Sequence, residues 1–264
     1  MLHCGVLYPF IPLYDLPAGR ALALTSGTRE SWMNAAQRSH VQGIGLGFLA
    51  GYVDTLGFVA LFGLFTAHVT GNFVLIGAIL AKDAHGSIAL KLLAFPAFIL
   101  GVAAARLLTV AAERRGGGAL RLALLMEWML LAGCMACGML AGPLTEMTQA
   151  DALAMAAGLF GATAMGAHSA ISRLQLAHLA PTSMMTGNVT QLVIDTVDVL
   201  RGAGDAITRA RCVKCLWPLL GFAAGAGIAA FAYLALGFAA LALPLVILAL
   251  LIVMEPAHGG ATAV

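Results

Sequence analysis

The sequence predicts an all-α, polytopic membrane protein, a transmembrane helical bundle of about six spans plus two short half-helices. Of the 264 residues, 61% are hydrophobic and only 10% are charged, which is more apolar than a soluble domain of this size requires. The apolar residues form runs long enough to cross a bilayer. In addition, one seven-residue stretch occurs twice, which predicts a two-fold internal repeat, with the halves inverted if both short helices are re-entrant.

The repeated stretch is the feature around which the two halves are arranged. The first copy is Thr66–Asn72 (TAHVTGN) and the second is Thr182–Asn188 (TSMMTGN). Each is typical of a helix start, because Thr caps helices and Gly and Asn tolerate a bent backbone. The unpaired N–H groups of a helix start cannot face hydrocarbon and need protein or water around them. Two copies therefore predict one site built by two halves.

The chain divides into four segments. Residues 1–38 are proline-containing and of mixed polarity, and we expect a disordered tail there, untranslated in part if synthesis begins at Met33. Residues 39–145 are expected to form a first transmembrane repeat and residues 146–256 a second. A short C-terminal tail, 257–264, follows.

The long apolar runs predict where the chain crosses the membrane. We expect spans over roughly 43–65, 88–111, 122–140 and 152–172, with two more in the charge-free stretch 216–254. The segments 70–81 and 182–200 differ from these. The first is too short to cross alone, and the second carries the polar stripe Gln191, Asp195 and Asp198, which is costly against lipid. These carboxylates are expected either to line an aqueous vestibule or to meet the adjacent arginines.

The distribution of arginine favours two re-entrant segments. If both short segments crossed fully, there would be about eight spans and the basic loop 114–121 would lie outside. If both are re-entrant, the arginines between Arg38 and Arg211 fall on the cytoplasmic side and the acidic loop 142–151 falls outside. Only the weakly charged loop 82–91 disagrees. The re-entrant arrangement also makes the halves inverted, as in many transporters.

Small residues recur along the first span beside a buried charge. Gly43, Gly47 and Gly51 lie on the helix face that also carries Asp54, and such a face lets another helix approach closely. We expect a homo-oligomer to use this face. A carboxylate in an apolar span is expected to bind a coupling ion, carry a proton or pair with a helix, although it can also be purely structural. In the second half Ser169 occupies the matching position.

Two motifs carry a resemblance to a known family. The first joins Gly51–Thr55 (GYVDT) to Thr70–Asn72 (TGN). The second joins Gly166–Arg173 (GAHSAISR) to Pro181–Leu192 (PTSMMTGNVTQL). Together they resemble the YoaK family of uncharacterised bacterial integral membrane proteins over roughly residues 40–254. The resemblance implies a multi-pass protein of the inner (plasma) membrane, suspected of transport. The family usually has Gln-Asn where this chain has His168-Ser169.

The function favoured by these features is a transporter or channel for a small polar or anionic solute. The helix starts would bind an anion through backbone N–H groups, or facing Asn72 and Asn188 amides would line a pore for a neutral solute. The alternatives are a membrane-embedded enzyme using Asp54, His68 and His168, and a structural membrane subunit. The expected substrate- or ion-binding residues are Asp54, Thr70, Gly71, Asn72, His168, Ser169, Thr186, Gly187 and Asn188.

Other polar residues are expected to be structural. Glu127 is expected to form a boundary ion pair with Arg121, at a predicted span's cytoplasmic end. The pairs Cys134–Cys137 and Cys212–Cys215 have metal-like spacing, but apolar packing explains them better. We therefore expect no metal and no cofactor. The expected partners are the lipid bilayer and a small solute, and not nucleic acid. The usual enzyme motifs are missing from the sequence, which favours a non-enzymatic role.

Overall fold

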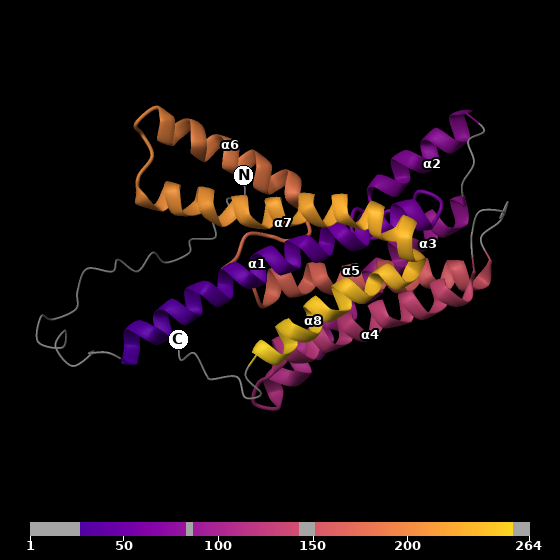
Figure 1. The fold of residues 1–264 in the computed structure, drawn as a ribbon, viewed down its shortest axis with the longest axis horizontal. Helices are drawn as coiled ribbons and strands as arrows, with labels where there is room; N and C mark the ends of the chain where they lie inside the picture. The colour runs from indigo at the N-terminus through magenta and orange to yellow at the C-terminus, as the bar shows by residue number, and fades with distance from the viewer. Residues whose placement is uncertain (1–26, 83–86, 143–150, 256–264) are drawn as a thin grey trace, which may run out of the picture. The chain divides into compact units, whose positions relative to one another are not determined.

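The structure is a computed structural model that describes residues 27–82, 87–142 and 151–255, without the side chains of 27–36 and 82. Every regular element in this part of the chain is helical, which confirms the predicted all-α class (Figure 1). The elements are α1 (Gly27–Ala60), α2 (Gly71–Lys82), α3 (Ile88–Arg114), α4 (Ala119–Leu140), α5 (Ala152–Leu174), α6 (Met185–Leu200), α7 (Ala206–Leu236), the 3-10 helix η2 (Gly237–Leu241) and α8 (Ala242–Met254).

The chain separates into two units, Met1–Ser39 and His40–Val264. In the first unit, α1 already begins at Gly27, inside the stretch expected to be a disordered tail. The three prolines of that stretch all precede residue 18, so none of them interrupts this helix. The remainder of the expected tail, the acidic loop 143–150 and the C-terminal tail lie outside the described residues. All that follows concerns the second unit.

Five stretches of the described helices are long and apolar enough to cross a membrane. They are Gln37–Ala60, Ile88–Arg114, Ala119–Leu140, Ala152–Leu174 and Ala206–Met254. The last contains α7, η2 and α8, and Figure 1 shows the chain turning back on itself between α7 and α8. The helices α2 and α6 are shorter, as predicted. The fold is a helical membrane bundle.

The first span ends earlier than predicted, at Ala60. Phe62 and Gly63 both have positive φ angles, 55° and 72°, and a left-handed residue stops an α-helix. The N–H of Gly63 donates to the carbonyl oxygen of Phe58 at 3.0 Å. The buried Lys91 of α3 donates from Nζ to the carbonyl oxygen of Phe62, which places a cation at the negative end of the helix. The chain then leaves the helix and continues as the loop 61–70, which leads into α2.

The helix α7 begins earlier than predicted, at Ala206 rather than near Leu216. Asp205 caps it, because its Oδ1 accepts the N–H of Thr208 at 2.7 Å. The basic residues of 209–214, expected in a loop, therefore lie on the first turns of a helix. This fixes their position relative to α6, which packs against α7.

Two pairs of helices approach each other so closely that the contact admits only glycine. A Cβ atom added to Gly51 of α1 would overlap the carbonyl oxygen of Phe222 in α7. In the other pair, a Cβ atom added to Gly166 of α5 would overlap the carbonyl oxygen of Phe98 in α3. Such contacts are typical of membrane helices that pack through small residues. They fix α1 and α5, whose C-terminal ends lead into the loops before α2 and α6.

The glycine face of α1 is covered by α7 of the same chain. Cβ atoms added at Gly43 and Gly47 would both meet Pro218, at its side chain and its backbone respectively. A second copy of the chain could use this face only if α7 left it. The homo-oligomer expected through Gly43, Gly47 and Gly51 stays a prediction.

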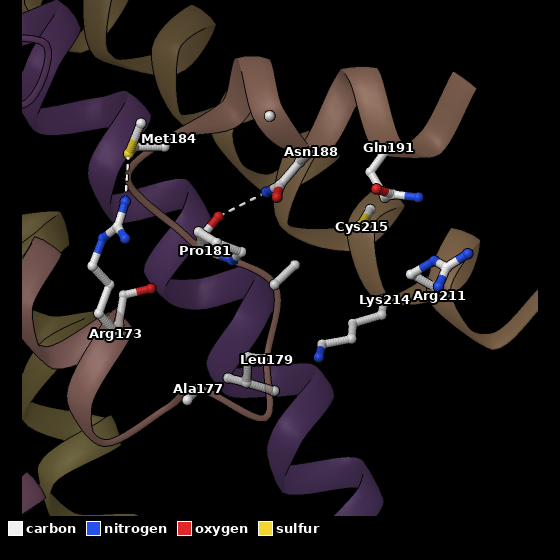
Figure 2. Close-up of a pocket in the computed structure, with 13 residues that line it drawn as sticks. Arg173, Ala177, Leu179, Pro181, Met184, Asn188, Gln191, Arg211, Lys214 and Cys215 are labelled. Atoms are coloured by element: carbon white, nitrogen blue, oxygen red, sulfur yellow. Dashed lines mark hydrogen bonds between the residues drawn. The ribbon is translucent and has the colours of Figure 1, made fainter. Parts of the chain in front are cut away.

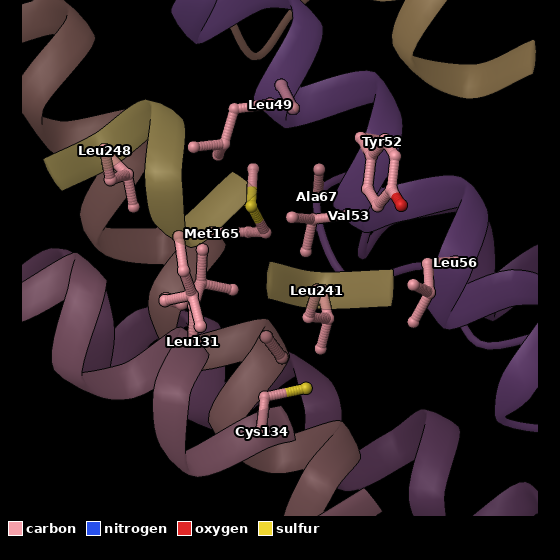
Figure 3. Packing of buried hydrophobic residues seen from close by; sticks show 14 of the residues in the cluster. Leu49, Tyr52, Val53, Leu56, Ala67, Leu131, Cys134, Met165, Leu241 and Leu248 are labelled. Carbon is pink, nitrogen blue, oxygen red and sulfur yellow. The ribbon is translucent and has the colours of Figure 1, made fainter. Parts of the chain in front are cut away.

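The main hydrophobic core joins α1, α4, α5, η2 and α8 (Figure 3). Members labelled there include Leu49, Val53, Leu131, Met165, Leu241 and Leu248. Two buried polar groups fix the return of the chain after α7. Tyr52 donates from Oη to the carbonyl oxygen of Ala240 at 2.8 Å, and Trp128 donates from Nε1 to that of Leu245 at 3.0 Å. Because these bonds satisfy polar groups inside the apolar core, they specify where η2 and α8 lie.

Candidate solute-binding site

The loop between α1 and α2, residues 61–70, is held by Asp54. Its Oδ1 accepts the N–H groups of Thr66 at 2.8 Å and of Ala67 at 2.7 Å, and its Oδ2 lies 2.6 Å from Nδ1 of His68. The carboxylate is buried, whereas the His68 side chain is 37% exposed. Asp54 therefore connects the end of α1 to the loop that leads into α2, and His68 lies between the carboxylate and open space.

Asn72 and Asn188 close their two loops in the same way. The Nδ2 of Asn72 donates to the carbonyl oxygen of Phe65 at 2.8 Å, and the Nδ2 of Asn188 donates to that of Pro181 at 2.7 Å, each to a residue seven positions earlier. Asn72 also accepts the N–H of Phe65 at 2.9 Å, a bond that Pro181 cannot make because it has no N–H. Both amides are buried and are engaged within their own loops. A pore lined by both amides stays a prediction.

The second loop, residues 175–184, is held by a different set of buried groups. The Nε2 atom of His168 lies 3.0 Å from Oγ1 of Thr182, and its Nδ1 atom lies 2.9 Å from Oε1 of Glu127. The N–H of Thr182 donates to Oγ of Ser172 at 3.1 Å. Glu127 and His168 are 0% and 1% exposed. The other oxygen of Glu127, Oε2, is buried and accepts no hydrogen bond from residues 27–82, 87–142 or 151–255.

Two local predictions are wrong. Glu127 pairs with His168 and not with Arg121, because six residues along α4 place the two side chains about 120° apart around the helix. Thr186 does not cap α6, since the helix begins at Met185 with Met184 as its N-cap residue. Thr186 lies in the first helical turn with its side chain exposed.

The two loops meet at one cavity of about 440 Å³, which we call the loop cavity. The first loop contributes Ala67–Thr70 and the second contributes Ser183 and Met184. Ser169 and Arg173 of α5 line it as well, and α3 closes it with apolar side chains. The Oγ atoms of Ser183 and Ser169 are 3.1 Å apart. None of the residues that line the loop cavity is acidic.

The loop cavity lies at the N-terminal ends of both short helices. Thr70 directly precedes α2, and Met184 is the N-cap residue of α6. Helix N-termini carry partial positive charge, although the N–H groups of the first residues of α2 already donate to carbonyl oxygens of the first loop. Arg173 adds a full positive charge. The cavity therefore has the electrostatic character of an anion site.

A second cavity of about 610 Å³, which we call the basic cavity, lies on the α6–α7 side of Arg173 (Figure 2). Its cationic lining residues are Arg173, Arg211 and Lys214. Arg173 and Met184 line both cavities, and Nη2 of Arg173 lies 2.9 Å from Sδ of Met184. These two side chains therefore stand between the basic cavity and the loop cavity.

The charge of Arg211 is balanced by Asp195. Nε and Nη2 of Arg211 donate to the two oxygens of Asp195 at 2.7 and 2.6 Å, and Gln191 donates to Oδ1 at 2.8 Å. The hydrogen bonds from Arg211 lower the pKa of the Asp195 carboxyl, so this group is an anion at neutral pH. Within the part of the chain that the structure describes, Arg173 and Lys214 form no ion pair. They carry the free positive charge of the basic cavity.

The acidic stripe of α6 meets arginines rather than a vestibule. Asp195 is buried against Arg211, and Asp198 lies 3.8 Å from Nη1 of Arg201. Of the two alternatives that the sequence leaves open, the structure therefore supports pairing with the adjacent arginines.

The predicted site residues fall into three groups. Thr70 and Ser169 line the loop cavity, with Gly71 next to Thr70. Gly187 and Asn188 line the basic cavity. Asp54, Asn72 and His168 lie behind the loops and hold them, and Thr186 lines neither cavity.

Sequence reasoning did not assign Arg173, Ser183, Met184 or Glu127 to the site. For Arg173 a signal was present, because it is the first charged residue after a long apolar span and closes the second motif. For Glu127 there was none, since its partner lies 41 residues away on another helix.

The comparisons with known proteins return one finding. The model of a family described as "Protein of unknown function (DUF1275)" matches residues 42–254. No curated protein and no solved structure matches the chain.

Proposed function

This chain belongs to the DUF1275 family of proteins of unknown function, and we propose that it is an inner-membrane transporter or channel for a small anionic solute. One observation carries the proposal: the loops before α2 and α6 meet at the same cavity, and Arg173 lines it beside their helix N-termini. A solute bound there would contact both halves of the chain at once. Binding sites of transporters commonly lie between two such halves.

The lining of the loop cavity favours an anion over a neutral or cationic solute. Arg173 supplies a full charge, the starts of α2 and α6 supply partial positive charge, and the hydroxyl of Ser169, which accepts from Ser183, supplies a further donor. Asn72 and Asn188, which a pore for neutral solutes would use, are engaged within their own loops. A volume of about 440 Å³ lies within the range of cavities that hold small molecules.

The basic cavity gives the solute a route to this site. Lys214 and Arg173 attract anions into it, and lining by one sign of charge raises the local concentration of the opposite ion. The Arg173 side chain lines both cavities, so it can contact the solute on either side of its contact with Met184. Movement of this pair would join the two cavities.

We further propose six passes, with α2 and α6 as re-entrant helices in two inverted halves. Each short helix follows a ten-residue loop, 61–70 or 175–184, and begins at the loop cavity. The same asparagine bond closes each loop. The close glycine contacts join α1 with α7 and α5 with α3, so each half supplies one helix to each pair. These correspondences support a repeated plan whose basic ends face the cytoplasm.

Single cysteines in a cysteine-free background test this topology. We expect Ala81→Cys to react with a membrane-impermeant maleimide in intact cells, and Arg115→Cys to react only after permeabilisation. Full crossing by α2 and α6 would reverse both results, because it moves these positions to the opposite sides. Arg201→Cys faces the cytoplasm in either arrangement and serves as the control.

Replacing Arg173 with alanine is expected to lower uptake of an anionic solute about 10- to 100-fold, since a hydrogen bond to a charged group is worth about 1.5–3 kcal/mol. The measurement is uptake into sealed liposomes. Inorganic phosphate and small dicarboxylates serve as probes, first screened by thermal shift, because a ligand that binds only the folded state raises its stability.

Arg115→Ala is the matched control, because it removes an exposed arginine that lines neither cavity. Equal uptake by the Arg173 and Arg115 variants would contradict the anion site. Turnover of a substrate in detergent, without uptake in liposomes, would instead favour the membrane-embedded enzyme.

A further inference from the structure

The least explained feature of the bundle is a buried acid–base pair behind the second loop. Glu127 of α4 and His168 of α5 are almost completely enclosed, and Oε1 lies 2.9 Å from Nδ1. The second carboxyl oxygen, Oε2, has no hydrogen-bond partner among the residues that the structure describes. An ionised carboxylate in an apolar site needs donors for both oxygens, and an unsatisfied charged oxygen is among the most costly buried groups.

No other charged group lies against this pair in the described residues. On α4 itself, Arg121 lies about 120° around the helix from Glu127, and on α5 Arg173 lines the two cavities. Of the charged residues of α3, which packs against both helices, Lys91 is bound to Phe62, and the others (Arg106, Glu113 and Arg114) are exposed. On the remaining neighbours, Asp54 of α1 is bound to the first loop, and η2 and α8 carry no charge. The polar contact that remains is Thr182.

The proton balance of the pair follows from this isolation. A carboxylate beside a neutral imidazole would leave one buried negative charge without compensation, which is strongly unfavourable. One added proton makes the pair neutral overall, either as carboxylic acid with imidazole or as carboxylate with imidazolium. The lone Oε2 of Glu127 favours the acid, whose O–H then donates from Oε1 to Nδ1 of His168.

The position of the proton determines the direction of the hydrogen bond between His168 and the second loop. While Glu127 is protonated, neutral His168 carries its own proton on Nε2 and donates it to Oγ1 of Thr182. When the pair opens to water, the Oε1 proton moves to Nδ1 and the Nε2 proton leaves to water. The remaining Nδ1–H then donates to the carboxylate, and the bare Nε2 accepts from the Thr182 hydroxyl. Thr182 directly precedes Ser183 and Met184, which line the loop cavity. Proton loss therefore reverses the hydrogen bond that holds this loop.

From this geometry we propose that Glu127 and His168 together hold one exchangeable proton and form a proton-coupling site. The pair keeps the proton while it is enclosed, and releases it to water when movement of the second loop opens the site. The coupling role rests on the proposed transport function, whereas the bound proton does not.

Infrared difference spectroscopy of the purified full-length protein tests the bound proton directly. A protonated carboxyl has a C=O band separate from that of a carboxylate. We expect this band in the wild-type protein at neutral pH, and its loss in Glu127→Gln. Glu113→Gln, which removes an exposed carboxyl of α3, should retain it. A spectrum left unchanged by Glu127→Gln would overturn the proposal.

A variant of His168 provides a second test, which still decides the question if Glu127→Gln does not fold. His168→Asn keeps an amide near the position of Nδ1 but cannot accept a proton. We expect its carboxyl band to remain and to shift in frequency, because the acid loses its imidazole acceptor. An unshifted band would show that the protonated group is not Glu127.

Liposomes loaded with a pH-sensitive dye test the coupling, with phosphate or a dicarboxylate as the probe. We expect proton uptake to accompany probe uptake in the wild type, and Glu127→Gln to move the probe without protons or to stop both movements. Linked uptake that persists in Glu127→Gln would overturn the coupling role. If no probe moves in any variant, the transport proposal fails, and the infrared band still decides whether the pair holds a proton.

Discussion

Replacement of Asp54 by alanine is expected to destabilise the protein by about 2–6 kcal/mol, because two buried N–H donors lose their acceptor and each costs about 1–3 kcal/mol. These donors are the backbone groups of Thr66 and Ala67, which are 1% and 8% exposed. His68 would also lose its partner, so the loop that lines the cavity would no longer be fixed. The shift in thermal unfolding temperature in detergent measures the effect.

Asp54→Asn separates the structural part of Asp54 from its charge. The asparagine Oδ1 can accept the same two N–H groups, so we expect this variant to keep most of the lost stability. Its amide faces His68 where the second carboxyl oxygen lay, so His68 loses an acceptor. If the alanine and asparagine variants unfold at the same temperature, Asp54 does not hold the loop through its oxygen.

Replacement of Gly51 by alanine is expected to cost about 1–3 kcal/mol, the usual penalty for overpacking a close contact. The added methyl group would overlap the carbonyl oxygen of Phe222, and a backbone atom cannot move aside as a flexible side chain can. The helices α1 and α7 would have to separate. A larger residue, as in Gly51→Leu, should prevent a stable bundle.

Gly45→Ala is the control for this prediction, because it makes the same chemical change on the same helix. A Cβ atom there would lie 3.6 Å from the side chain of Ile247, which is an ordinary contact. Since alanine also favours the helix by up to about 1 kcal/mol over glycine, this variant should be neutral or slightly stabilised. Thermal unfolding of both proteins decides the matter, and equal stabilities would contradict the close approach of α1 and α7.

The helical membrane bundle could be predicted because span length depends on a property of single stretches, their apolar composition. The ends of the helices were predicted less well, because single residues rather than the composition of a stretch determine where a helix begins or ends. At Phe62 the end of α1 depends on a left-handed non-glycine residue, which has no sequence signature. Asp205 is a typical capping residue, but the predicted span was placed at the charge-free stretch 216–254, and so missed the true start of α7 at Ala206.

Of the candidate site, the sequence predicted mainly the parts that carry the repeated stretch. The two Thr-Gly-Asn stretches predicted that both loops belong to the site, and both line the same cavity. The roles within the loops were harder to predict, because Asn72 and Asn188 could equally face a solute or their own backbone. The close approach of a helix to the glycine face of α1 could be predicted, but not which residues of two helices pair. Glu127 finds His168 only because α4 packs against α5.

The order of synthesis gives the Glu127–His168 pair a further consequence during membrane insertion. His168 follows Glu127 by 41 residues, so at about 5–20 residues per second the ribosome adds it roughly 2–8 s later. During this interval α4 carries an acid without its partner, and an ionised acid near the bilayer centre costs about 2.5–3.5 kcal/mol. His168 of α5 then gives this acid its hydrogen-bond partner. Residues 27–142 made alone would therefore lack the partner of a buried acid, so α4 is completed by a helix that is synthesised after it.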